Sequence, residues 1–330
     1  MRNVYLVIVL SFTANIAIAA SYDECILSKM AGADNDDDVQ SIRETCQANI
    51  HKSKQEGVQS GAISERFLAE RQTQWNRHTI TAHKQNYILP YTHSDKLNRE
   101  AYKFNSDWAD EIKHYEAKFQ LSIKVPLTSK PIFTDSDGFY VGFTLQAWWQ
   151  LYASEISAPF RETNYQPEVF YLTALNWHPF DGNTGVIVGV EHQSNGRTQL
   201  LSRSWNRAYT SFLFEKDNFA LSLRPWYRLK EDKKDDPGES KGDDNPDIEK
   251  FMGHFELRSA YRWNEHEFSL MGHNNLRSNN KGAVELGWSF PLFGHLKGFV
   301  QYFNGYGESL VDYNNDTERL GVGILLTDLL

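Results

Sequence analysis

The chain has 330 residues, a formal net charge of −9 and an aromatic content of 14%. The excess of acidic over basic side chains gives no general attraction to phosphates, so we expect no nucleic-acid partner. The mean hydropathy is −0.57, and beyond the first residues no apolar stretch is long enough for a spanning helix, which excludes a membrane protein built from apolar helices.

The first residues have the composition of an export signal. Arg2 supplies a positive charge, the stretch 4–12 is mostly apolar, and Ala17-Ile18-Ala19 is a small-x-small pattern typical of a cleavage site. The apolar stretch is too short to favour a membrane anchor. We therefore predict a signal peptide over residues 1–20 and an oxidising compartment for the rest of the chain.

Residues 21–83 differ from the rest of the chain, and we interpret them as a small N-terminal extension in the periplasm. They hold the only two cysteines, Cys25 and Cys46, which an oxidising compartment would pair; two free thiols are the alternative. The acidic run at 34–38 begins like a calcium-binding loop, but other residues occupy the required glycine and glutamate positions, which favours a solvated linker. The stretch Ser64 to Gln74 is compatible with a helix.

From residue 84 onward, apolar and polar side chains alternate, as they do in β-strands whose two faces meet different surroundings. In the stretch 185–194 the residues of one face are Val186, Val188, Val190, His192 and Ser194. The other face includes Glu191 and Gln193, and the stretches 218–229 and 282–292 likewise place Arg or Glu in the middle of a strand opposite an aromatic-rich face. A soluble sandwich also alternates, but this combination favours a membrane barrel with a polar lumen.

The alternation predicts an all-β fold, a twelve-stranded antiparallel transmembrane β-barrel over residues 84–330. We expect strands near residues 86–92, 119–127, 138–152, 166–177, 184–194, 204–216, 218–230, 248–263, 266–276, 281–292, 295–304 and 318–328. An even number of strands leaves both termini on one side, which we take as the periplasm. The longer connections at 153–165, 195–203, 231–247 and 305–317 then lie outside the cell.

Two polar residues, His192 and Ser194, end the strand 185–194 on its apolar face, which in a barrel points to lipid. If this strand and the next form a hairpin centred near Gln199, Asn206 lies opposite His192, with Cβ atoms ~5 Å apart. Ser194 can then act as nucleophile, His192 as its base and Asn206 as the group that fixes the histidine tautomer. A His-x-Ser pair is by itself a weak signal, and ordinary interfacial polar residues are the alternative.

The surrounding sequence is more specific. The string His192-Gln193-Ser194-Asn195-Gly196-Arg197 is followed by Ser202-Arg203-Ser204-Trp205-Asn206-Arg207 and then Tyr209, and further matching segments lie at 157–165, 243–247 and 304–309. In this order, these segments resemble the signature of the outer-membrane phospholipase A family. The resemblance covers residues 84–330.

The resemblance implies an outer-membrane enzyme that hydrolyses acyl esters of phospholipids, requires calcium and works as a homodimer. The positions that match the family's catalytic residues are His192, Ser194 and Asn206. The positions that match calcium ligands are Arg197 (through its carbonyl oxygen), Ser202, Asp244 and, donated by the partner chain, Ser157. Strand parity places all four in connections outside the cell, and hard oxygen ligands suit calcium.

Two other functions fit a barrel of this size. One is a passive porin, which has no use for His192, Ser194 and Asn206 on the lipid side and whose lumen here is narrow and lined with charge. The other is a structural or adhesin-like barrel, for which longer loops are expected. The sequence therefore favours the enzyme, and it leaves the position of the cleaved ester and the headgroup preference open.

Overall fold

The computed structural model describes residues 61–330 except residues 77, 104–105, 135, 198, 237–238, 240–241 and 295. The predicted signal peptide over 1–20, the pairing of Cys25 with Cys46 and the acidic run at 34–38 lie outside this described part. Within it, no helix combines the length and the apolar character that crossing a bilayer requires.

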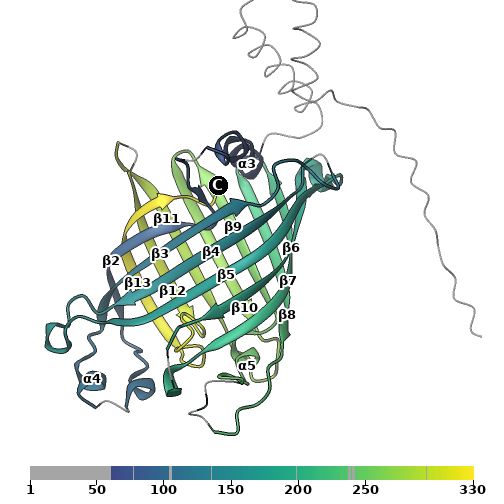
Figure 1. Ribbon diagram of the computed structural model, residues 1–330. Helices are drawn as coiled ribbons and strands as arrows, with labels where there is room; N and C mark the ends of the chain where they lie inside the picture. The colour runs from purple at the N-terminus through teal and green to yellow at the C-terminus, as the bar shows by residue number, and fades with distance from the viewer. Residues whose placement is uncertain are drawn as a thin grey trace, which may run out of the picture. The chain divides into compact units, whose positions relative to one another are not determined.

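Twelve antiparallel strands close into a barrel, which confirms the predicted fold (Figure 1). Each strand pairs with the next along the chain, and the last pairs with the first to close the ring. The strands are β2 (Asn86–Ser94), β3 (Tyr115–Pro126), β4 (Gly138–Trp149), β5 (Phe160–Leu175), β6 (Asn183–Ser194), β7 (Ser204–Lys216), β8 (Phe219–Leu229), β9 (Phe255–Trp263), β10 (His266–Asn274), β11 (Gly282–Phe293), β12 (Leu296–Gly305) and β13 (Thr317–Thr327).

Three predicted strand starts are wrong, and one strand is additional. The strand expected from residue 119 begins at Tyr115, where it already pairs with β2. The strand expected from residue 248 begins at Phe255, because Glu249–Met252 forms a helical turn, α5. The strand expected from 166 begins at Phe160, since its pairing with β4 continues into the connection. The additional strand, β1 (Thr81–Ala82), pairs with the end of β3 beyond the reach of β2.

The two faces of the strands differ as the alternation predicts. On β6, Val188 and Val190 are about half exposed on the outer wall, whereas Glu191 is buried in the lumen. Gln193 also faces the lumen, where its Oε1 accepts hydrogen bonds from Trp205 and Arg207 at 2.8 and 3.2 Å. The apolar outer wall suits lipid, and the polar residues turn inward.

Ion pairs fill the lumen near the end where the longer connections lie. Glu116 accepts from Arg161 and Arg319 at 2.9 Å each, and Arg161 also donates to Asp312 at 2.8 Å. Arg319 continues the network to Glu308 at 2.7 Å. Opposite charges in contact lower the cost of burying each one, so each charge of this network is buried together with a partner of opposite sign.

Helix α3 (Ala62–Thr73) confirms the helix expected over residues 64–74 and packs at the same end of the barrel as the C-terminus (Figure 1). Its first amides, from Ile63 and Ser64, donate to the buried carboxylate of Glu215 on β7 at 2.7 and 3.1 Å. An anion at a helix N-terminus satisfies donors that have no partner within the helix. Arg66 donates to the carbonyl oxygens of Asp328 and Leu329, which ties the helix to the last residues.

The opposite end of the barrel carries most of the short helices. They are η1 (Arg99–Tyr102), α4 (Ser106–Glu111), η2 (Ser154–Ile156), η4 (Gln199–Leu201) and α5, whereas η3 (Pro179–Asp181) lies at the end with α3. The end with the longer connections also holds the end of β6 and the start of β7, where the candidate catalytic residues lie.

Candidate active site

The hairpin of β6 and β7 has the register that the sequence predicts. His192 pairs with Asn206, and Ser194 pairs with Ser204. The Nδ1 atom of His192 and the Oδ1 atom of Asn206 are 2.8 Å apart, within hydrogen-bonding distance. An amide oxygen can only accept, so Nδ1 carries the proton and the lone pair of the ring lies on Nε2. Three candidate residues thus share one outward-facing patch of two strands.

The connection between β6 and β7 is built around one buried side chain, Asn195. Its Oδ1 accepts from the backbone amides of Arg197 and Arg203 at 3.3 and 3.0 Å, and its Nδ2 donates to the carbonyl of Leu201 at 2.7 Å. The next residue, Gly196, has a φ of +60°, a conformation that glycine adopts without a Cβ clash. An asparagine side chain that bonds nearby backbone groups is typical of a tight turn, and it fixes the loop next to Ser194.

Hard oxygen donors meet in the connection after Ser194. The hydroxyl of Ser202 donates to Asp244 at 2.7 Å, and the hydroxyl of Ser204 lies 3.5 Å from the same carboxylate. Lys234 forms an ion pair with the other oxygen of Asp244. The structure therefore brings Ser202 and Asp244 together, although 42 positions separate them in the chain.

The connection between β8 and β9 carries Asp244 and is anchored on both sides. Asn245 is fully buried, and its Oδ1 accepts from the amide of Ser204 at 3.1 Å. Asp247 accepts from the hydroxyl of Tyr313 at 2.6 Å. Burial, together with this hydrogen bond, raises the pKa of Tyr313, so it remains a donor at neutral pH. These contacts hold Asp244 beside the β6–β7 connection.

The side chain of Arg197 bonds elsewhere than this oxygen cluster, and Ser157 lies in another connection. The guanidinium of Arg197 donates to the carbonyls of Phe160 and Arg161 at 2.7 and 3.0 Å, at the start of β5. Ser157 is exposed, has a φ of 64°, and ends helix η2 in the connection between β4 and β5. Among the contacts of the described residues, none joins Ser157 to Ser202 or Asp244. Among the described residues, the contacts thus join two of the four predicted calcium positions, Ser202 and Asp244.

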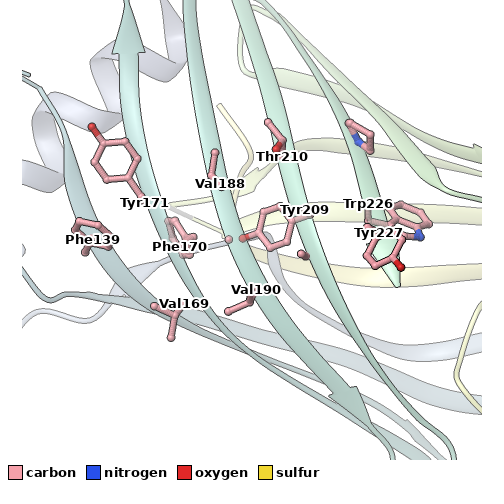
Figure 2. Close-up of a pocket in the computed structure, with 13 residues that line it drawn as sticks. Phe139, Val169, Phe170, Tyr171, Val188, Val190, Tyr209, Thr210, Trp226 and Tyr227 are labelled. Carbon is pink, nitrogen blue, oxygen red and sulfur yellow. The ribbon is translucent and has the colours of Figure 1, made fainter. Parts of the chain in front are cut away.

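Next to the candidate residues, towards the middle of the strands, the outer wall is hollowed; Figure 2 shows the side chains that line this hollow. The hollow has a volume of about 530 Å³ and is lined by Phe139, Val169, Phe170, Tyr171, Val188, Gly189, Val190, Ala208, Tyr209, Thr210, Pro225, Trp226 and Tyr227. Val190 and Ala208 pair across the hairpin, two residues along each strand from the pair of His192 and Asn206. Small side chains at these positions leave room between larger neighbours, and the hollow is apolar.

Sequence reasoning missed three residues of this site. Asn195 and Asn245 shape the connections, and Glu231 accepts a hydrogen bond from Nδ2 of Asn206 at 2.7 Å. The Asn-Gly dipeptide after the strand is a turn signal that points to Asn195. Glu231 and Asn245 lie in a connection crowded with charged and polar residues, where no local signal separates them from their neighbours.

Comparison with known proteins decides the family. The sequence profile for the family described as "Phospholipase A1" matches residues 63–326. Phospholipase A1 from Escherichia coli K12 is 39% identical over 271 residues, which cover 82% of this chain and 88% of that protein. The Klebsiella pneumoniae phospholipase A1 is 40% identical over 256 residues, or 77% and 84% of the two chains.

The chain belongs to the phospholipase A1 family. This confirms the resemblance drawn from the sequence and makes the protein an outer-membrane phospholipase rather than a passive barrel.

Solved structures agree with this membership. An asparagine-to-alanine active-site mutant of outer membrane phospholipase A from Escherichia coli has a TM-score of 0.72 and 37% identity, covering 80% of this chain and 98% of that one. The outer membrane phospholipase dimer of Salmonella typhi with bound calcium has a TM-score of 0.72 and 36% identity, with the same coverage of 80% and 98%.

Proposed function

We propose that this phospholipase hydrolyses the acyl ester bonds of phospholipids and lysophospholipids, with A1 and A2 activity, on the extracellular side of the outer membrane. Ser194 is the nucleophile, His192 the base and Asn206 the residue that orients the base. The observation that carries this proposal is the 2.8 Å contact between His192 Nδ1 and Asn206 Oδ1 on a lipid-facing wall. Polar groups that face lipid cost free energy, so their presence at this place indicates a function.

The chain's own residues account for the proton transfers. Asn206 holds the Nδ1 proton, which leaves Nε2 of His192 to accept the proton of the Ser194 hydroxyl as its oxygen attacks the ester carbonyl. The imidazolium then gives that proton to the leaving alcohol, and an acyl-enzyme remains on Ser194. Water, activated by the same imidazole, releases the fatty acid.

The oxygen cluster beside the nucleophile fits calcium. The Ser202 hydroxyl oxygen and a carboxylate oxygen of Asp244 are hard ligands 2.7 Å apart. The ion pair with Lys234 shows that the Asp244 carboxylate attracts a cation at this position. We propose that Ser202 and the carbonyl of Arg197 hold one ion and that Asp244 contributes to a further position. Calcium held by these residues would supply a positive charge that polarises the attacked carbonyl and stabilises the oxyanion.

The apolar hollow is a candidate seat for an acyl chain. Its rows of Val188, Val190 and Ala208 lie on the same outer wall as His192 and continue away from it toward the middle of the strands. An acyl chain lying there would bring its ester group to the level of Ser194. A barrel in lipid meets its substrate from the side, so no channel through the lumen is needed.

We further propose a homodimer in which Ser157 of each chain completes the calcium site of its partner. Ser157 is exposed at the end of a tight turn, and the Salmonella typhi relative is a dimer with bound calcium. A site divided between two chains keeps a monomer inactive while phospholipid surrounds it.

The division can be tested with two inactive variants, Ser194→Ala and Ser157→Trp, mixed in detergent with calcium. A mixed dimer contains one complete site, so activity should recover to about a quarter of the wild-type value for random pairing of equal amounts. Mixed dimers that cross-link but remain inactive would exclude the divided site.

The domain organisation follows the same proposal. Residues 1–20 are a signal peptide, 21–83 a periplasmic extension and 84–330 the barrel with the phospholipase activity. The test of the whole proposal is hydrolysis of defined phospholipids by the purified protein in mixed micelles, with and without a calcium chelator, and identification of the released chains. Ser194→Ala is the matched control, and ester hydrolysis that persists in this variant would overturn the assignment.

A further inference from the structure

The side chain of Asn206 has two hydrogen-bond partners, and one of them lies outside the proposed triad. Its Oδ1 bonds Nδ1 of His192 at 2.8 Å, and its Nδ2 donates to Oε1 of Glu231 at 2.7 Å. An ionised carboxylate only accepts hydrogen bonds, so the amide must turn its NH₂ group to Glu231 and its oxygen to His192. The contact with Glu231 therefore sets the orientation of the amide.

Strand register brings Glu231 to this position. Asn206 pairs with Leu229, the last residue of β8, and Glu231 follows two residues later. Residues two apart along an extended chain lie on the same face. Leu229 and Tyr227 are exposed on the outer wall, so Glu231 continues their row beside Asn206.

The segment around Glu231 is held in place by its own connection. The carbonyl of Asp232 accepts from the amide of Asp243 at 2.8 Å, and Lys233 forms a β-bridge with the same residue. Asp243 in turn pairs with Arg228 of β8 at 2.6 Å. The backbone on both sides of the bridge is thus fixed directly after the strand, although the Glu231 side chain is exposed.

We propose that Glu231 is a positioning residue of the active site that acts through Asn206. This inference rests on the proposed mechanism of Ser194, His192 and Asn206. Glu231 holds the amide so that its oxygen faces His192, which keeps the imidazole proton on Nδ1. No proton passes to Glu231: the proton of Ser194 moves to Nε2 of His192 and from there to the leaving alcohol.

The carboxylate also changes the charge distribution of the amide. Asn206 is neutral and by itself stabilises the imidazolium less than an aspartate would. A carboxylate bonded to its NH₂ group draws positive charge toward Nδ2 and leaves Oδ1 more negative, because hydrogen bonds in a chain polarise one another. The imidazolium that forms during attack then meets a stronger acceptor.

Single substitutions of Glu231 distinguish the effect of its hydrogen-bond acceptor from the effect of its negative charge. In Glu231→Leu the acceptor is lost, and we expect kcat to fall about tenfold with KM within about twofold, because a charge-assisted hydrogen bond that matters in the transition state is removed. Glu231→Gln retains an accepting oxygen, so about a two- to threefold loss is expected. Asp232→Asn removes the same charge from the neighbouring exposed position and should leave kcat unchanged.

The decisive test reverses the polarity of the hydrogen bond. Asn206→Asp has no N–H for Glu231 and places two carboxylates against each other, so this variant should be poorly active. In the double variant Asn206→Asp/Glu231→Gln, the glutamine NH₂ can donate and the new carboxylate can still accept from His192. We expect about tenfold higher kcat in the double variant than in Asn206→Asp, although Glu231→Gln lowers kcat in the wild-type background.

A residue that only supports the fold cannot reverse the sign of its effect. If Glu231→Gln changes kcat by the same factor in both backgrounds, the positioning role is wrong. The three variants of this cycle differ little in side-chain volume, so the result stands even if Glu231→Leu folds poorly. Ser194→Ala distinguishes the two levels: activity in that variant would refute the proposed mechanism itself, whereas an inactive Ser194→Ala with an additive cycle would refute only the role of Glu231.

Discussion

Polar side chains occupy two regions of this barrel, the lumen and the outer wall, and they are organised in opposite ways. In the lumen, Arg161, Glu116 and Arg319 are at most 3% exposed, and their charges meet opposite charges on more than one side. On the outer wall, His192, Asn206 and Glu231 form a linear chain of two hydrogen bonds. Its side chains are partly or fully exposed.

The difference separates architecture from chemistry. A lumen charge that is bonded on several sides stabilises the interior and has little capacity left for a reacting group. In the hydrogen-bond chain on the outer wall, His192 uses one ring nitrogen to bond Asn206, and the other nitrogen serves the proposed proton transfer. Substitutions in the two regions should therefore change different quantities, stability in one and turnover in the other.

The largest expected effect is on the outer wall. Ser194→Ala and His192→Ala should each lower turnover about 10⁴-fold or more, because members of a catalytic unit act together. Asn206→Ala should cost less, about 10- to 100-fold, since this residue orients and does not react. All three should keep the denaturation midpoint of the wild type. A variant that loses stability together with activity would contradict the claim that outer-wall residues affect turnover and not stability.

The lumen should show the reverse behaviour. Arg161→Met leaves Glu116 and Asp312 without their shared partner, and we expect the free energy of unfolding to fall by about 3 kcal/mol. The activity of the folded fraction should stay within about twofold, because Arg161 takes no part in the proposed proton transfers.

Two further variants serve as controls, with denaturant unfolding in detergent as the measurement. Adding Asp312→Asn to Arg161→Met should recover part of the lost stability, since it removes a buried charge whose ion-pair partner is gone. The pair of Lys96 and Asp316 is exposed, and Lys96→Met should have no measurable effect. Equal losses from Lys96→Met and Arg161→Met would contradict the role given to burial.

A third effect tests the oxygen cluster between the two regions. Ser202 lies 2.7 Å from Asp244 and Ser204 lies 3.5 Å from it, so the two serines form a matched pair. Ser202→Ala should raise the calcium concentration for half-maximal activity about tenfold, as expected for loss of one ligand, and Ser204→Ala should raise it less. Calorimetric calcium binding gives the same comparison without turnover, and equal affinities in the two variants would argue against Ser202 as a ligand.

The smallest effect is expected at the far end of the barrel. Glu215→Gln removes the negative charge at the start of α3 but keeps the size of the side chain, so docking of the helix should weaken by about 1 kcal/mol. Limited trypsin cleavage at Arg66 and Arg71 should become about fivefold faster, with turnover unchanged. A change in turnover would connect α3 to the distant active site, which the separation of the two regions does not predict.

Much of the candidate site can be read from local pattern. The alternation of β6 shows which of its side chains face outward, and the length of its connection to β7 gives the pairing of His192 with Asn206. The family signature adds Ser202 and Asp244 as positions of interest. The strand starts at 115, 160 and 255 were mispredicted, because pairing and helical turns in the connections override the alternation there.

The sequence by itself determined the number of strands, the lipid-facing wall and the hairpin that carries Ser194, His192 and Asn206, because a period of two and a short connection act between near neighbours. The tertiary structure decided the contacts between distant segments. Glu231 reaches Asn206 over 25 positions, Asp244 reaches Ser202 over 42, and Glu215 receives Ile63 over 152. Each of these contacts depends on the conformation of a connection. That conformation is set only when the closed barrel fixes the positions of the two strand ends that the connection joins.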